Sequence, residues 1–430
     1  MREKSRFRFT RSAGFTLVEI MIGLLIGMIA IVVIMETFAV SEGYKRTSTS
    51  GSDAQVNGGV ALYLLQREIR LAGYGMNSLI PTGCTSIVVF NANTGTSSNM
   101  RMVPFEINPA GVLAGDPNTD VILVAYGASE NFVQGVPADQ PSNSAANFKI
   151  TQNRDGFRNG DLVIGVQPGG GPGGAISCAL HQVTDVPGTG GNCGSPPSGG
   201  SDVVEHNTGK YKNPNNNCQQ TDPVFNESGG ITDPNGNKVP ALNSAQGGQL
   251  FDLGALPQIK VYAIHGGALT TCDMLNQDCT QLANYSVMVD NIVSLRAVYG
   301  KDFDGTPNPT TPAGDGQVDQ WDRGALATSN EASRVLAAAI EITARNGLKE
   351  KPKSGTACDA TSDPNHPDAA QISKSWFDAF NNKPADLTGQ ADIDLSATAP
   401  TGAPPTDWKC YRYKLFQTVV PLRNMIWRPS

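Results

Sequence analysis

The stretch Gly14-Phe15-Thr16-Leu17-Val18-Glu19, followed by an apolar run that continues to Met35, decides the architecture of this chain. The run from Phe15 to Met35 is about 21 residues long, and a helix of that length spans the roughly 30 Å hydrocarbon core of a bilayer. A cleaved secretory signal has a shorter apolar core of about 7–15 residues. The sequence therefore predicts a retained membrane helix near the N-terminus.

The charges on either side of this run predict its orientation. The preceding flank carries Glu3 and five cations, which are Arg2, Lys4, Arg6, Arg8 and Arg11. The flank after Val40 is the mixed segment Ser41-Glu42-Gly43-Tyr44-Lys45-Arg46. By the positive-inside rule the N-terminus lies in the cytoplasm, and everything after about residue 45 is exported.

One carboxylate, Glu19, interrupts the apolar run close to its start. An acidic side chain at the centre of a membrane helix costs roughly 2.5–3.5 kcal/mol on insertion scales, and less near the membrane surface. A charge at this position predicts a partner of opposite sign. The alternative is an ordinary signal anchor in which Glu19 faces the lipid headgroups.

The segment from Gly14 to Glu19 and the apolar helix after it resemble the class III signal of type IV pilins and type II secretion pseudopilins. The resemblance implies that a prepilin peptidase cuts between Gly14 and Phe15 and methylates the new amine of Phe15. It also implies that Glu19 meets the free amine of a neighbouring subunit during assembly. A carboxylate and an ammonium group can pair in a lipid-like filament core, where either alone would be costly.

The helix is expected to continue beyond the membrane, with possible bends near Gly43, Gly51 or Gly58-Gly59. Its apolar positions follow helical spacing up to Gly73: Val56, Val60, Leu64, Leu65, Ile69 and Leu71. The run from Leu65 to Tyr74 resembles the same region of minor pilins of the PilW group. The implied fold class is α+β and pilin-like, with a long N-terminal helix packed on an antiparallel sheet. The expected parts are a leader (1–14), a membrane or filament-core helix (15–40), its amphipathic continuation (41–75) and an exported β-rich domain (76–430).

The exported domain reads as short strands joined by long loops. The strands, rich in β-branched or aromatic residues, are expected at Ser86–Phe90, Val121–Tyr126, Asp161–Val166, Leu180–Thr184, Ile259–Ile264, Ile292–Tyr299, Val335–Thr343 and Tyr413–Val420. Segments 167–201 and 206–248 are poor in apolar residues and are expected to be surface insertions or flexible loops. The segment Tyr411–Asn424 resembles the closing strand of PilW-type pilins, and the tail Met425-Ile426-Trp427 is expected to pack back on the domain.

Eight cysteines lie beyond the membrane helix, which is an even set typical of an oxidising, extracytoplasmic compartment. Spacing favours a small loop closed by Cys272 and Cys279. Two further pairs are plausible, Cys178 with Cys193 and Cys358 with Cys410, although eight cysteines permit 105 connectivities. A zinc site is disfavoured because the sequence has no C-x-x-C pair.

An acidic loop is a candidate calcium site. Ca²⁺ takes six to eight oxygens, and an EF-hand-type loop supplies them in a fixed order with Gly at the sixth position. If residues 305–314 are treated as one expanded position, the candidate ligands are Asp302, Asp304, Asp315, the Gln317 carbonyl, Asp319 and Asp322. The insertion and the short Asp322 in place of Glu depart from the pattern, and the alternative is a set of turn-forming aspartates.

Composition and motifs argue against other classes. The net charge is −7, and loss of the leader would make it −11, which disfavours nonspecific nucleic-acid binding. No phosphate-binding loop, H-E-x-x-H or G-x-S-x-G pattern is present, so we expect no catalytic residue and no enzymatic activity. His181 lies in a strand-like run and is expected to be a surface or core residue.

Together these features suggest a minor type IV pilin of the PilW kind, stored in the inner membrane with its domain in the periplasm and placed on the cell surface after assembly. The resemblance implies partners: other minor pilins, the major pilin, prepilin peptidase, the inner-membrane assembly platform and a large tip adhesin. The alternatives are a minor pseudopilin of a type II secretion system, and a pilin-anchored adhesin or DNA-uptake subunit.

Overall fold

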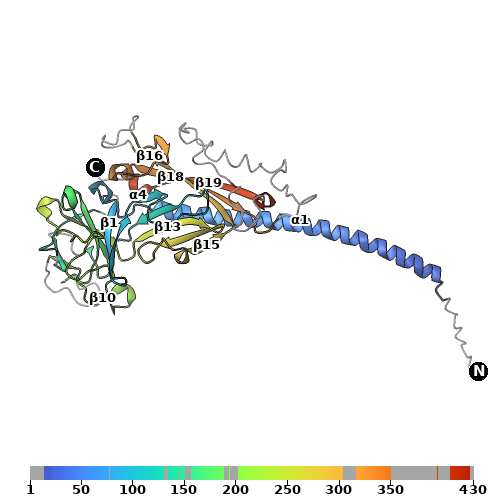
Figure 1. Cartoon of the computed structure of the whole chain (residues 1–430), viewed down its shortest axis with the longest axis horizontal. Coiled ribbons are helices and arrows are strands. Elements are labelled where there is room, and N and C mark those ends of the chain that lie inside the picture. The colour runs from blue at the N-terminus through green and yellow to red at the C-terminus, as the bar shows by residue number, and fades with distance from the viewer. Residues whose placement is uncertain are drawn as a thin grey trace, which may run out of the picture. The chain divides into compact units, whose positions relative to one another are not determined.

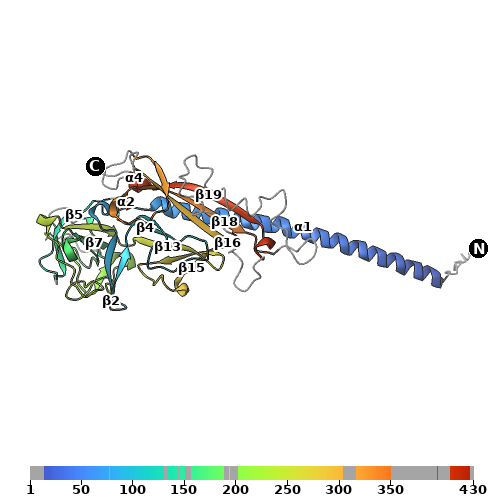
Figure 2. The same ribbon diagram turned by 45° about the horizontal axis from the view of Figure 1, so that its top comes forward.

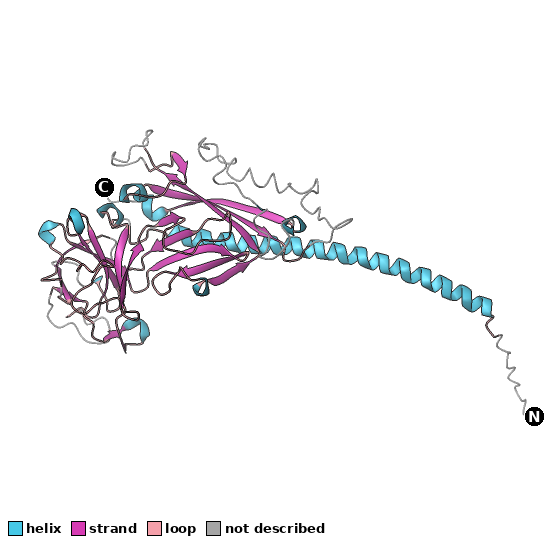
Figure 3. Ribbon diagram, viewed as in Figure 1, coloured by secondary structure: helices cyan, strands magenta, loops and turns pink. Residues whose placement is uncertain are grey.

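The computed structural model describes residues 14–76, 78–129, 134–143, 145–150, 156–187, 193, 202–303, 316–349, 395 and 407–426. The chain divides into two compact units, Met1–Asp53 and Ala54–Ser430. Figure 3 shows one long helix and a domain made mainly of strands. The expected α+β class is therefore confirmed.

Helix α1 runs from Leu17 to Leu71 as one continuous element (Figure 1). Thr16 starts it: its carbonyl accepts the amide N–H of Ile20 at 3.1 Å, and its Oγ1 accepts the amide N–H of Glu19 at 3.3 Å. The part Leu17–Glu42 is long and apolar enough to cross a membrane, with a mean hydropathy of 2.9. Its most apolar stretch buries no residue within the chain, as a segment made for a lipid environment would.

In the second unit, the last five turns of α1 pack into the main core. The buried positions are Ala54, Ala61, Leu65 and Ile69, whereas Val56, Val60 and Leu71 are exposed. The predicted apolar stripe is thus only half right, because small residues rather than valines face the sheet. Gly58 shows why: a Cβ there would lie 2.0 Å from the ring of Phe416, so glycine permits close helix–strand approach.

Two antiparallel sheets lie along this part of α1 (Figure 2). The five-stranded sheet has the order β15 (Ser286–Asp290), β14 (Ala268–Asp273), β13 (Gln258–His265), β4 (Ile122–Tyr126), β3 (Phe105–Ile107). The four-stranded sheet has the order β17 (Gln320–Asp322), β16 (Ile292–Lys301), β18 (Val335–Arg345), β19 (Tyr413–Pro421). The buried Tyr299 of β16 links the two, since its hydroxyl accepts the amide N–H of Ile107 at 2.6 Å.

A third sheet lies beyond the C-terminal end of α1 (Figures 1 and 2). Its order is β2 (Thr96–Arg101), β1 (Ser86–Asn91), β8 (Ser177–Gln182), β7 (Leu162–Gln167), β12 (Gln249–Gly254), β5 (Val136–Asp139), β6 (Asn147–Ile150), β9 (Val203–Glu205). Only β1 and β8 pair in parallel among the described strand pairs. A separate hairpin joins β10 (Tyr211–Asn213) to β11 (Gln219–Thr221). This sheet has a second core of its own, which includes Phe148, Phe157 and Leu250.

Short helical turns connect these strands. They are Ile80–Thr82, Pro172–Gly174, Pro214–Asn216, Ser244–Gln246, Leu282–Asn284, Asp407–Cys410, α2 (Ser329–Ser333) and α4 (Arg423–Ile426). The segment 206–248, expected as an insertion, contains β10, β11 and two of these turns, and it buries Tyr211, Phe225 and Ile231.

The C-terminal segment closes the domain. Strand β19 pairs with β18 along its whole length, from Tyr413 against Arg345 to Pro421 against Ala337. Of the tail expected to pack on its own domain, Met425 is fully buried, Ile426 is 37% exposed, and Trp427 lies outside the described residues. The Asn424 side chain donates to the carbonyls of Leu71 and Ala72 at 3.1 and 3.2 Å, so the end of the chain caps α1.

Candidate functional site

The predicted processing site lies at the start of the described chain. Gly14 and Phe15 precede α1 without regular structure, and 78% of Phe15 is exposed. Residues 1–13 of the predicted leader lie outside the described residues. An exposed, irregular peptide next to a helix is the kind of segment that proteases cleave.

Glu19 lies in the first turn of α1 and is exposed. A carboxylate in that turn interacts favourably with the positive end of the helix dipole. Among the described residues, Glu19 forms no ion pair, so its carboxylate is open to a cation from outside the described chain. This exposure is what pairing with another subunit requires.

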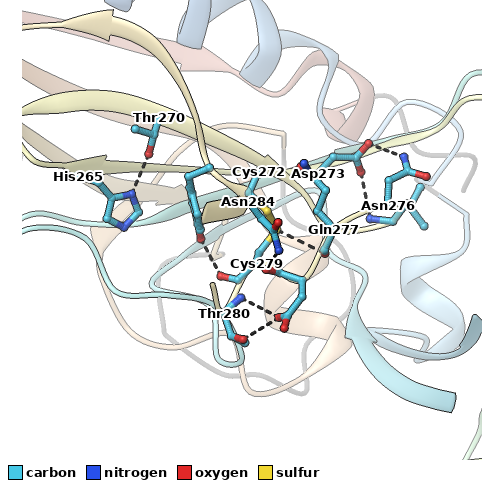
Figure 4. Close-up of a disulfide and its surroundings, with 12 residues drawn as sticks. His265, Thr270, Cys272, Asp273, Asn276, Gln277, Cys279, Thr280 and Asn284 are labelled. Carbon is cyan, nitrogen blue, oxygen red and sulfur yellow. Dashed lines mark hydrogen bonds between the residues drawn. A yellow bond between two sulfur atoms is a disulfide. The ribbon is translucent and has the colours of Figure 1, made fainter. Parts of the chain in front are cut away.

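The disulfides confirm one predicted pair and correct another. Cys272 and Cys279 are joined across a seven-residue separation, as predicted (Figure 4). The pairing of Cys178 with Cys193 is wrong: Cys178 is bonded to Cys84, and Cys193 to Cys218. Cys410 is also disulfide-bonded, while Cys358 lies outside the described residues.

The sheet topology explains the Cys84–Cys178 bond. Strands β1 and β8 are parallel neighbours, with Val88 opposite Ala179. Cys84 precedes β1 and Cys178 lies near the start of β8, so parallel pairing brings them to the same end with their Cα atoms 6.0 Å apart. Sequence proximity could not have found a contact between residues 94 positions apart.

The Cys272–Cys279 loop is held by local hydrogen bonds as well (Figure 4). The Asp273 carboxylate accepts from the Leu275 amide N–H at 3.0 Å and from the Asn276 side chain at 2.7 Å. The Cys279 carbonyl accepts the Tyr285 hydroxyl at 3.0 Å. These are the turn contacts expected of an Asp-rich loop, and they explain its compactness without a bound ligand.

The acidic loop lies where β16 ends and β17 begins. Asp304 and Asp315 lie outside the described residues. Asp302 Oδ2 accepts the amide N–H of Gly316 at 2.9 Å, and Asp319 Oδ2 accepts that of Phe303 at 3.0 Å. The described carboxylates therefore tie the two ends of the loop together.

Two features bear on calcium binding at this loop. Gly316 has φ +84°, which fits the sharp turn of the sixth position, and the Gln317 carbonyl follows it. Asp322 forms an ion pair of 2.8 Å with the buried Lys301, so the protein itself supplies a cation to the last predicted ligand. No group of three His, Cys, Asp or Glu side chains suited to a metal occurs within the described residues. The donor chemistry fits Ca²⁺ only in part, and calcium binding stays a prediction.

Calcium should raise the melting temperature of the full-length protein if the loop binds it. At a Ca²⁺ concentration of 100 times Kd, linkage adds about 2.7 kcal/mol to the free energy of unfolding. The double variant Asp315→Asn/Asp319→Asn should lose this increment, whereas the exposed control Asp222→Asn should keep it. Differential scanning calorimetry with Ca²⁺ and with chelator measures both, and a wild-type protein indifferent to chelator would contradict calcium binding.

A cluster of aromatic rings in the eight-stranded sheet holds two histidines. His181 lies in β8, and His206 follows β9, with their ring centroids 4.7 Å apart. Phe148 of β6 stacks on His206 at 4.2 Å and meets His181 edge-on at 5.1 Å. Burial lowers the pKa of His181 well below its ordinary value and lowers the pKa of His206 to about 4. Both imidazoles are therefore neutral at neutral pH.

This histidine pair should contribute a loss of domain stability on acidification. The folded pKa values lie below the unfolded value of about 6.5, so the unfolded state binds more protons as pH falls from 6.5 towards 4. His206 alone should contribute about 3 kcal/mol over that window. Burial raises the pKa of Asp252 to about 6 and that of Glu341 to about 8, and both groups act in the opposite direction.

Chemical denaturation at a series of pH values isolates the histidine contribution. The double variant His181→Phe/His206→Phe should flatten the loss of stability between pH 6.5 and 4. The control His265→Gln, which lies outside the cluster, should retain the wild-type slope. If the free energy of unfolding changed with pH by the same slope in all three proteins, a neutral buried histidine pair would be contradicted.

No protein-family model, curated protein or solved structure matches this chain. The chain has a long apolar N-terminal helix followed by a β-rich, disulfide-bonded domain, which is consistent with a pilin-like architecture.

Proposed function

We propose that this chain is a minor subunit of a type IV pilus, of the PilW kind, that primes or joins filament assembly. The observation that carries the proposal is helix α1. It begins at Leu17, two residues after Phe15 of the proposed processing site, and runs without interruption to Leu71. Its second part then packs on antiparallel sheets. This coupling of a membrane helix to a sheet-packed helix gives a subunit both an anchor and an exported head.

Assembly begins, in this proposal, when prepilin peptidase cuts between Gly14 and Phe15 and methylates the new amine. Before cutting, the subunit is stored in the inner membrane with its N-terminus in the cytoplasm and its domain in the periplasm. The disulfides support export, because such bonds persist in oxidising compartments. The exposed Glu19 then pairs with the N-terminal amine of a neighbouring subunit.

A second surface supports contact with other subunits. Val56, Val60 and Tyr63 lie four and three residues apart on α1, and their exposed fractions are 58%, 45% and 62%. Residues with this spacing share one helix face. An exposed apolar helix face supports packing against other minor pilins and the major pilin. The assembly platform and a large tip adhesin complete the proposed partners.

Deletion of the gene tests this function. Surface pili and secreted proteins are counted side by side in the deletion strain and in a complemented strain. Lost or sparse pili with normal secretion is the expected result. Normal pili with blocked secretion would instead identify a type II secretion pseudopilin, and normal pili with normal secretion would identify an accessory ligand-binding subunit.

A further inference from the structure

A lysine and an aspartate are in direct contact in the four-stranded sheet. Lys301 ends β16, Asp322 ends β17, and Nζ of Lys301 lies 2.8 Å from Oδ1 of Asp322. Only 5% of the Lys301 side chain and 14% of the Asp322 side chain are exposed. None of the contacts proposed for the filament involves this pair, so its chemistry is independent of the proposed function.

The pairing of β16 with β17 places the two side chains on one face of the sheet. In the antiparallel register Tyr299 lies opposite Asp322, and Lys301 lies opposite Gln320. Residues two apart on a strand share a face, so Lys301 and Asp322 are diagonal neighbours on the same side. Long side chains reach across such a diagonal of about 7–8 Å. The contact is therefore set by the strand register.

Aromatic rings separate this ion pair from water. Nζ of Lys301 lies 5.1 Å from the ring centre of Tyr299 and 6.0 Å from that of Phe303, and both aromatic residues are buried. Tyr299 belongs to the main core, where Phe105 meets its ring edge-on. Two charges in such surroundings lose hydration, and this loss can exceed their mutual attraction. A product without charges avoids that loss.

Burial distinguishes this pair from the other lysine ion pairs of the described chain. Nζ of Lys210 lies 3.4 Å from Asp222, and 61% and 72% of these side chains are exposed. Nζ of Lys238 lies 4.0 Å from Glu227, and 41% and 23% of these side chains are exposed. Buried lysines give up their proton readily, whereas the guanidinium of arginine stays charged in proteins. Lys301 thus combines contact with a carboxylate and exclusion from water.

We propose that Lys301 and Asp322 join in an isopeptide bond. The Lys301 ammonium first passes one proton to an Asp322 oxygen, which gives an amine and a carboxylic acid. The amine nitrogen then attacks Cγ of Asp322 and forms the new C–N bond. The C–O bond to the hydroxyl breaks, the nitrogen gives a second proton to the departing oxygen, and one water molecule leaves. The step needs no oxidant, reductant or other reactant.

Proximity favours the amide over the separate groups. In dilute solution an ammonium and a carboxylate are favoured over an amide and water. Well-oriented groups within one molecule reach effective concentrations of about 10⁵–10⁸ M, and attack starts from about 3–3.5 Å. Nζ of Lys301 lies 2.8 Å from an oxygen that is bonded directly to the reacting carbon. The fold thus supplies both the orientation and the water-excluded surroundings.

The bond would tie β17 to β16 across the acidic loop, because Lys301 and Asp322 flank that loop. The linked Asp322 keeps one uncharged carbonyl oxygen, which is a weaker calcium ligand than a carboxylate. The isopeptide bond and a calcium contact through the Asp322 carboxylate are therefore alternatives.

The test is peptide mapping by mass spectrometry of the full-length protein, purified in detergent and with its disulfides reduced. Trypsin does not cut after an acylated lysine, and no other Lys or Arg lies between Lys301 and Arg323. We expect residues 297–323 as one tryptic peptide, lighter than its sequence by one water molecule. A protease that cuts before aspartate should then open the loop and leave two peptides joined through Lys301 and Asp322.

Three results would overturn the proposal. Complete cleavage after Lys301 would show that the pair remains ionic. A 297–323 peptide of full mass would be a missed cleavage without a bond. A separate 302–323 peptide that has lost water would indicate a cyclic imide at an Asp-Gly sequence, such as Asp315-Gly316, that forms without Lys301.

A variant and an internal control locate the bond. Lys301→Arg keeps the positive charge but cannot form the amide, so its 302–323 peptide should be released at full mass. The exposed Lys210–Asp222 pair is the matched control within the wild-type chain, and trypsin should cut after Lys210. Water loss that persists in Lys301→Arg, or a Lys210 joined to Asp222, would contradict a bond selected by burial at Lys301. The assay needs no pili, so its failure would leave the proposed function untouched.

Discussion

Replacing Glu19 by alanine should leave the subunit inserted in the membrane and cut after Gly14, but should reduce its incorporation into filaments by about tenfold or more. The reason is the cost of an unpaired ammonium in an apolar filament core, which is several kcal/mol when its carboxylate partner is removed. Immunoblots of membranes and of sheared pili from the same cells measure the membrane-inserted and the filament-incorporated protein.

Glu36→Ala is the matched control for this prediction. Glu36 is an exposed carboxylate on the same helix, one residue after the apolar run ends. The Glu36→Ala variant should be incorporated into filaments as the wild type is. The Glu19→Gln variant, which removes the charge and keeps the size, should behave like Glu19→Ala. Normal incorporation of Glu19→Ala would contradict the pairing with the Phe15 amine.

Replacing both Cys84 and Cys178 by alanine should lower the free energy of unfolding by about 4.5 kcal/mol. The bond closes a loop with a sequence separation of 94, and the entropy gained by the unfolded chain grows with loop length. The same relation gives about 2.5 kcal/mol for the Cys272–Cys279 bond, whose separation is 7. Urea denaturation of the full-length variants in detergent measures both losses.

The comparison between these two disulfides is the control. Both double variants remove a pair of buried, disulfide-bonded cysteines, so they differ mainly in loop length. A loss for Cys272→Ala/Cys279→Ala that equals or exceeds that of Cys84→Ala/Cys178→Ala would contradict the loop-entropy account. It would indicate that local packing, such as the hydrogen bonds of Asp273, dominates instead.

The parts of the fold that the sequence predicted are those with strong local patterns. All eight expected strands are present, and the long helix ends at Leu71, two residues before the expected stop at Gly73. The strands that were missed carry polar residues, as in Thr96–Arg101 and Gln219–Thr221. Such strands form because a neighbouring strand satisfies their backbone, which no local pattern reveals.

The candidate sites show the same difference between features with a local sequence pattern and features that depend on distant contacts. Gly14, Phe15 and Glu19 are contiguous, so a local motif was enough to single them out. The cluster of His181 and His206 depends instead on a long-range contact: β8 and β9 are far apart in the strand order, and the bridge between Asp185 and Glu205 joins the segments that carry the two rings. Single histidines at positions 181 and 206, the first in a strand-like run, form no sequence pattern that predicts their contact. The buried helix face was also misjudged, because Gly58 permits the close approach of Phe416 in β19 and Ala61 is buried in the main core.

The capping of α1 by Asn424 has a consequence for biogenesis. The core face of α1 around Leu65 and Ile69 shares its hydrophobic cluster with Val420, Leu422 and Met425, so its cover includes residues that are distant along the chain. Contacts between such distant positions form slowly, and the exposed helix face and strand edge of β18 would attract other chains meanwhile. A truncation that removes residues 421–426 should therefore leave this face uncovered, and the truncated protein should be degraded.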